Sequence, residues 1–310
     1  AVVGALALAF AAWNDVRQPA NDDEPVAATA TTPAARQAIA VLGFRNLANR
    51  ADVQWLSTAF GEMLTTELGA GESLRTIPGE NVGRMKVELG LDDADSYGTD
   101  TLRRIQRNLG TDLVVYGSYV TVGQAPNESI RFDIRLQNAR EDESTVLVSE
   151  TGRADELFSL LARAGRRLRE RLGIAPTSEE IDSVRASQPA SADGARRYAE
   201  GVDHLRRFDA LGARTVLEEA IASDPNFPLA HAALPNAWAA LGYDVRASDA
   251  ARRAFELSDR LPRKDRLVVE GTYRELANAW PDAIRIFPFD FVPRVIPARA
   301  VGVYQLVVKE

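Results

Sequence analysis

The chain of 310 residues contains no cysteine, only three lysines and only two histidines. The absence of cysteine excludes disulfide bonds, thiol catalysis and thiolate metal sites, but it is compatible with an oxidising or a reducing compartment. Without cysteine, His204 and His231 make a poor metal site, so no metal and no acid–base role is expected for them. The chain also lacks an excess of positive charge, since its net charge is -7. Nucleic acid is therefore not an expected partner.

Motifs for nucleotide chemistry are missing as well. The sequence has no phosphate-binding glycine loop, no dinucleotide-binding fingerprint and no kinase catalytic motif. Asp93 and Asp95 have the spacing of a calcium-binding loop, but Arg104 stands where an EF-hand needs a bidentate glutamate. The arginines between 163 and 171 fit a phosphate or acidic-lipid site, although the solvated end of a helix accounts for them without a ligand. We therefore expect no catalytic residue, no cofactor and no metal in this chain.

The first thirteen residues, AVVGALALAFAAW, carry no charge. A bilayer span takes about 20 apolar residues, so the run is too short to span alone, and a signal-peptide core or a buried helix are alternatives. Residues 14–37 are rich in proline, alanine, threonine and aspartate and predict a flexible linker, which disfavours a buried helix. No methionine precedes the run and Trp13 suits a membrane interface, so residues 1–13 are interpreted as the exit end of a transmembrane helix. Residues 14–310 would then be membrane-anchored and extracytoplasmic (periplasmic).

Residues 38–174 predict an α+β domain, a mixed sheet with packed helices. Short apolar runs indicate strands, and apolar residues at helical spacing indicate helices. The strands are expected at 38–44, 73–78, 112–123, 129–139 and 145–152, and the helices at 55–68, 82–91, 99–110 and 154–173. Thr99 or Asp100 is expected to cap the third helix and Gly110 to end it.

Downstream of a connector at 175–190, which holds a capping box at Thr177–Glu180, the pattern is helical and repeats about every 34 residues over 191–287. Residues at matched offsets should let antiparallel helices approach closely. They are Gly201, Ala213, Leu217, Ala220 and Pro225, then Ala247, Ala251 and Ala254, then Gly271, Ala283 and Phe287. Pro235 should kink its helix. Residues 288–310 have no helical period and predict an irregular tail, either strand-like or truncated or out of frame.

The helical part resembles tetratricopeptide (TPR) repeats, and the fold class expected for the whole chain is therefore an α+β domain followed by an all-α, TPR-like helical solenoid. Residues 38–174 resemble the TolB amino-terminal-like (FlgO-like) α/β domain of bacterial proteins. The residues that carry this resemblance are Phe44, Asn46 and Leu47, Gly110 and Asp112, and Gly117 and Ser118. No catalytic residue comes with that family.

The two resemblances together imply the C-terminal region of a bacterial membrane-bound serine/threonine protein kinase, whose catalytic domain would lie upstream. The expected function is a non-catalytic sensory or scaffolding region of a signalling protein. Its repeats would bind a protein or peptide, and its N-terminal segment would bind the membrane. The alternatives are an envelope or periplasmic assembly or transport-associated protein, and the sensory tail of a transcription regulator or an adenylate cyclase.

Overall fold

The computed structural model describes residues 36–71, 73–123, 128–138 and 145–277. Several predictions concern residues outside these ranges. They are the membrane segment at 1–13, nearly all of the linker, the tail at 288–310, and the packing residues Ala283 and Phe287. Within the described part, no helix has the length and apolar composition that a membrane span requires. The sheet and the helices that follow it belong to one compact unit.

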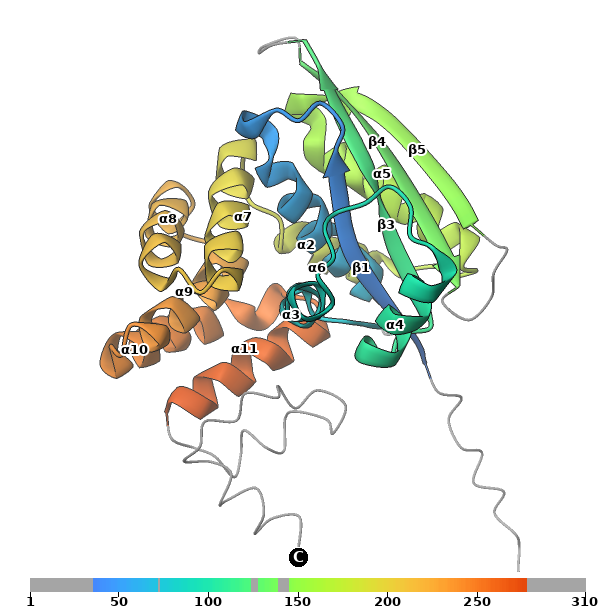
Figure 1. Cartoon of the computed structure of the whole chain (residues 1–310). Coiled ribbons are helices and arrows are strands. Elements are labelled where there is room, and N and C mark those ends of the chain that lie inside the picture. The colour runs from blue at the N-terminus through green and yellow to red at the C-terminus, as the bar shows by residue number, and fades with distance from the viewer. Residues whose placement is uncertain (1–35, 72, 124–127, 139–144, 278–310) are drawn as a thin grey trace, which may run out of the picture. The chain divides into compact units, whose positions relative to one another are not determined.

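Five strands form one mixed sheet (Figure 1). The strands are β1 (Gln37–Asn46), β2 (Leu74–Thr76), β3 (Leu113–Val122), β4 (Ser129–Asn138) and β5 (Thr145–Arg153). Their order in the sheet is β2-β1-β3-β4-β5. Strand β1 is parallel to both of its neighbours, β2 and β3, whereas β4 is antiparallel to both β3 and β5. The central strands β1 and β3 are buried along most of their length, because helices cover both faces of the sheet, whereas β4 alternates between buried and less buried residues.

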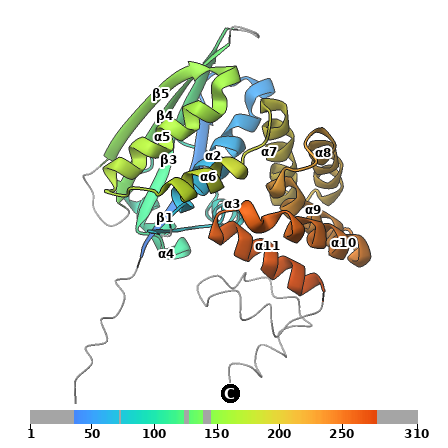
Figure 2. The same ribbon diagram turned by 180° about the vertical axis from the view of Figure 1, so that it is seen from behind.

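One face of the sheet packs against α2 (Trp55–Gly69) and α5 (Leu157–Arg171), and the other against α3 (Gly79–Leu89) and α4 (Thr99–Leu109). Figure 2 shows α5 lying across the first of these faces. Stacked and edge-on aromatic rings fill that side of the core, with Phe60 against Phe44, Tyr119 and Phe132. Every strand and helix expected between residues 38 and 174 is present in the expected order.

One local prediction in this part is wrong. Helix α4 begins at Thr99, and the residue before it is Gly98, so neither Thr99 nor Asp100 is the N-cap and no side chain caps the helix. The left-handed residue Gly110 does end it, as the sequence predicts. Two short 3-10 helices, η1 (Ala51–Val53) and η2 (Ala154–Glu156), were not expected.

After α5, the residues that the structure describes form helices and their connecting turns. Its elements are α6 (Ser178–Ala186), α7 (Ala192–Arg206), α8 (Ala210–Ser223), α9 (Pro228–Ala240), α10 (Asp244–Glu256), η3 (Ser258–Arg260) and α11 (Arg263–Leu276). The predicted capping box at Thr177–Glu180 starts α6. From α7 to α11 each helix packs on the next, and α7 also packs on α2. Helix α9 continues through Pro235 without interruption. The described residues therefore form an α+β domain followed by an all-α region.

Candidate functional site

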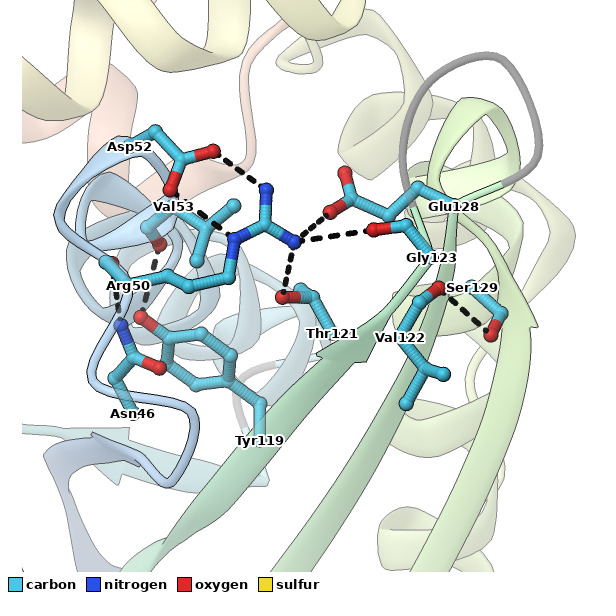
Figure 3. A network of polar contacts seen from close by, with 10 residues as sticks. All are labelled: Asn46, Arg50, Asp52, Val53, Tyr119, Thr121, Val122, Gly123, Glu128 and Ser129. Atoms are coloured by element: carbon cyan, nitrogen blue, oxygen red, sulfur yellow. Dashed lines mark hydrogen bonds and ion pairs between the residues drawn. The ribbon is translucent and has the colours of Figure 1, made fainter.

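The loop after β1 is held to the β3–β4 end of the sheet by one arginine (Figure 3). Arg50 donates hydrogen bonds to both oxygens of Asp52, to Thr121 Oγ1 at 3.2 Å and to Glu128 Oε1 at 2.6 Å. The bond from Arg50 lowers the pKa of the Asp52 carboxyl. Because protein carboxylates and a hydroxyl engage this guanidinium, we interpret the network as a clamp on the loop and not as a ligand site.

The motif residues Phe44, Asn46 and Leu47 lie beside this clamp. Phe44 is in the core, whereas Leu47 is exposed. The Asn46 amide donates to the Arg50 carbonyl at 2.8 Å, and its buried Oδ1 has no hydrogen-bond partner. The Tyr119 hydroxyl donates to the Val53 carbonyl at 2.9 Å, which fixes the far side of the same loop.

The other four motif residues lie just before β3 or within it. Asp112 Oδ2 accepts a hydrogen bond of 2.9 Å from the Ala38 amide at the start of β1. Gly110 ends α4 next to it, and Ser118 is buried within β3. A Cβ on Gly117 would lie 2.0 Å from the Asp133 carbonyl oxygen of β4. Six of the seven motif residues thus have a structural explanation in burial, hydrogen bonding, close packing or the end of a helix, and the seventh, Leu47, is exposed.

The acidic segment with the spacing of a calcium loop packs against β1 instead, where the pairing register with β3 shifts between Val41 and Gly43. Asp93 forms an ion pair with Lys86 and accepts a 2.7 Å hydrogen bond from the Ser57 hydroxyl. Gly43, with φ of 121°, makes room for this carboxylate, since a Cβ there would lie 2.2 Å from Asp93 Oδ1. Asp95 is within 3.6 Å of Arg45. No cluster of three potential metal ligands occurs in the described part of the chain.

Three of the five arginines of α5 are ion-paired with carboxylates, whereas Arg166 and Arg171 are exposed. Arg163 and Arg167 both contact Glu150, at 3.1 and 3.0 Å. Arg169 is buried and contacts Glu67 of α2 at 2.5 Å. These pairs fasten α5 to the sheet and to α2, so Arg163, Arg167 and Arg169 need no bound phosphate or lipid to balance their charge.

Most of the described residues predicted to bring the repeat helices together are buried, but Pro225 is exposed. A Cβ on Gly201 of α7 would lie 2.6 Å from Leu217 of α8, so the two helices approach as the sequence suggests. The other described members of the set within helices α8 and α10 are Ala213, Ala220, Ala247, Ala251 and Ala254, all buried. Pro225 precedes α9, and Gly271 is buried in α11.

Both histidines have structural roles. His231 is buried in α9 and its Nε2 lies 3.0 Å from the Pro225 carbonyl oxygen, to which it donates. Burial lowers the pKa of His231, which keeps the ring neutral. His204 Nδ1 contacts Asp209 Oδ2 at 2.8 Å at the end of α7.

Helix α7 is joined to the α/β domain by half-buried charges. Arg206 forms an ion pair with Glu62 of α2, against Gly79 at the start of α3. Lys264 of α11 donates to Thr76 Oγ1 of β2 at 2.5 Å. Burial lowers the pKa of Lys264 and raises that of its neighbour Asp265. The cavity beside this junction measures about 20 Å³, the space of one water molecule, so we place no ligand in it.

Large apolar side chains stand exposed where α7 turns into α8 and where α9 turns into α10. Phe208 is 92% exposed and Val245 is 77% exposed, and Leu211 and Tyr243 are also exposed. We call these four residues, together with the exposed Arg246, the turn edge. The spacing of 35 residues between Phe208 and Tyr243 is one repeat, so both turns lie at the same end of the antiparallel helices.

A stacked core connects the two turns. The Arg214 guanidinium of α8 lies 5.3 Å from the centre of the Trp238 ring of α9, and that of Arg246 lies 4.7 Å from the same ring. Tyr243 packs edge-on against Trp238 at 5.4 Å. This surface was not predicted from the sequence, because the repeat was recognised from its small packing residues alone. The recurrence of large apolar residues at the turns was the available signal.

No family model matches the chain, and no curated protein matches it. Solved structures that are similar to part of it include two bacterial lipoproteins. The C-terminal domain of LpoB from Salmonella enterica is 15% identical, with 38% of this chain and 83% of that chain covered and a TM-score of 0.29. Lipoprotein GNA1162 from Neisseria meningitidis is 14% identical, with 44% and 98% covered and a TM-score of 0.29. Likenesses at this level leave the function to be argued from the chain's own residues.

Proposed function

We propose that this chain is a non-catalytic interaction region that binds a protein partner through its helices α7–α10. The turn edge is the observation that carries the proposal. Four large apolar side chains are gathered on two neighbouring turns and exposed to solvent. Apolar residues grouped in this way are a feature of protein-binding surfaces, while singly scattered ones need no explanation.

The wider setting of the proposal comes from the sequence. The uncharged N-terminal run supports attachment to a membrane, with the folded part extracytoplasmic. The resemblances to a TolB amino-terminal-like domain and to TPR repeats support a bacterial signalling protein, with a serine/threonine kinase domain upstream. In that setting the chain would report partner binding on one side of the membrane to an enzyme on the other.

Site-specific photo-crosslinking in cells tests the binding function. A photo-crosslinking residue is placed at Leu211 or at Tyr243 of the full-length protein, and the control carries it at Val87, which is 76% exposed on α3. We expect the same partner to be crosslinked from both turn positions and not from Val87. Equal crosslinking from all three positions, or none from the turns, would contradict the proposal.

A further inference from the structure

Phe208 has a backbone conformation that suits glycine. Its φ is 61°, in the left-handed region, where a bulky side chain is strained. It ends α7, and the amide of Asp209 after it donates to the His204 carbonyl at 2.9 Å. The position 34 residues later, at the end of α9, has the same geometry and is occupied by Gly242, with φ of 79°.

Packing within the described residues does not compensate for the strained backbone of Phe208. The side chain is 92% exposed, so it buries almost no apolar surface in the fold. A glycine would form the same helix end at lower conformational cost, as Gly242 does. A residue that is unfavourable for folding and unburied in the free protein has the properties of an anchor that a partner covers.

Arg246, on the neighbouring turn, has an exposed side chain. Among the residues that the structure describes, it has no hydrogen bond and no ion pair, and its guanidinium stacks on Trp238 at 4.7 Å and near Tyr243 at 5.9 Å. Stacking on an aromatic face leaves the N–H groups along the edge of the guanidinium free to bind a carboxylate through two parallel hydrogen bonds. Because stacking already orders the side chain, binding would cost little further entropy.

The acidic side chains near the turn edge do not fill that role. Asp209 accepts a hydrogen bond of 2.9 Å from the Gly212 amide and contacts His204. Asp244 lies in the first turn of α10, where the helix dipole stabilises its charge. Glu218 lies 3.8 Å from Arg214 and not beside Arg246.

We propose that the turn edge binds a protein segment that presents a carboxylate next to a large apolar side chain. Arg246 receives the carboxylate, and Phe208 with its exposed neighbours covers the apolar side chain. The inference rests on the proposed function and specifies the chemistry of the partner. The stacked Arg214–Trp238–Arg246 core makes one continuous surface of the two turns.

A random-peptide display library, panned against the whole 310-residue chain, provides the probe. We expect the recovered peptides to be enriched in aspartate or glutamate within a few residues of leucine or an aromatic residue. Peptide affinity is then measured by fluorescence polarisation. Arg246→Gln and Phe208→Gly should each weaken binding about tenfold or more. Arg246→Lys should also weaken it, because lysine keeps the charge but lacks the fork of the guanidinium.

The matched controls separate binding from folding. Arg252→Gln removes an exposed arginine of the same helix, one that pairs with Asp249, and should leave peptide affinity unchanged. Phe208→Gly should raise the urea midpoint of unfolding while it weakens binding, since it relieves the strained φ. A structural role for Phe208 predicts the opposite change in stability.

Each outcome decides between the two proposals. Peptides that bind equally well to both variants, or that show no enrichment in acidic residues, overturn this inference and leave the binding function intact. If no peptide is recovered, the partner segment that crosslinks in cells to Leu211 or Tyr243 is sequenced. A crosslinked segment without an acidic residue beside an apolar one also overturns this inference. Absence of peptides together with absence of crosslinks overturns the proposed function itself.

Discussion

At the scale of single residues, two glycines of the sheet have side-chain positions that other atoms already occupy. At Gly43 the occupant is the Asp93 carboxylate, the end of a side chain, and the φ of 121° adds strain to any substitution. At Gly117 the occupant is the backbone carbonyl of Asp133, and this oxygen cannot move unless β3 and β4 separate. The two positions require glycine for different reasons.

Gly117→Ala should therefore destabilise the fold by about 3 kcal/mol or more, as forced overpacking does. Urea denaturation measures the change. The matched control is Gly61→Ala in α2, where nothing beyond the adjacent residues and the helix's own backbone lies within 4 Å of the new Cβ, and this variant should gain about 0.5–1 kcal/mol of helix stability. A Gly117→Ala protein as stable as the parent would show that the two strands are not held at this distance.

His231 should make the helical part sensitive to mild acid. Its pKa is lowered in the fold by burial, so its contribution is complete above the unfolded value of about 6.5 and is lost as the pH falls through the folded value. The loss amounts to about 1.4 kcal/mol for each unit of pKa difference. His231→Gln keeps a donor for the Pro225 carbonyl and does not titrate.

The test compares the free energy of unfolding of the two proteins between pH 7 and pH 5. The parent should lose more stability than His231→Gln over this range. Glu67, Asp265 and Glu275 have raised pKa values, so acidification stabilises the fold through them in both proteins, and their effect cancels in the difference. Parallel pH curves would rule out the role assigned to His231.

At the scale of elements, α5 is held to α2 by a buried ion pair. Arg169 Nη1 donates to Glu67 Oε2 and to the Glu67 carbonyl, both at 2.5 Å. Burial raises the pKa of Glu67, while Arg169 opposes that change. Gly165 lets the helices meet here, since a Cβ on it would lie 3.2 Å from the Glu67 side chain.

Arg169→Leu alone should destabilise the protein by about 3–5 kcal/mol, because it leaves Glu67 buried without its cation. The double variant Glu67→Leu/Arg169→Leu should recover much of that loss, since two apolar side chains pack without a desolvation penalty. Chemical denaturation of both variants and the parent gives the comparison. A double variant no more stable than the single one would mean that the pair itself is needed for packing.

The elements could be predicted from the sequence because apolar periodicity is local information. The run at 38–44 and the stripe of α5 each indicate their structure within a dozen residues. The missing cap of α4 shows the limit of such reasoning, since a threonine next to a glycine does not reveal which residue precedes the first turn. The clamp at Arg50 was missed because Thr121 and Glu128 are more than seventy positions away in the chain. The anchor properties of Phe208 depend on a backbone angle, which no composition pattern encodes.

At the scale of the whole molecule, α7 connects the repeat helices to the α/β domain. It packs on α2, and the Arg206–Glu62 ion pair lies against the start of α3. A second contact comes from α11, where Lys264 donates to Thr76. The sequence predicted the two parts and their order, but contacts between distant polar residues have no periodic signal, so this junction was not foreseen.

Arg206→Ala should loosen the helices while the sheet stays intact, because Glu62 then lacks its partner. Hydrogen exchange measured by mass spectrometry should show faster exchange in α7 and α11 and unchanged protection in β1 and β3. Arg207→Ala is the matched control, since this exposed neighbour pairs only with Asp203 within the described residues. Equal exchange in Arg206→Ala and the parent would mean that apolar packing alone holds the junction.

The position of β1 in the sheet also governs how the chain must acquire its structure during synthesis. This strand leaves the ribosome before its two neighbours, yet it pairs with β2 and with β3, whose residues begin 37 and 76 positions after its own first residue. Because β2 pairs with only the first three residues of β1, most of the apolar run of β1 has no hydrogen-bonding partner until β3 has been translated. The nascent chain is consequently most prone to aggregation before β3 emerges, and this is the interval in which a ribosome-associated chaperone would improve its yield.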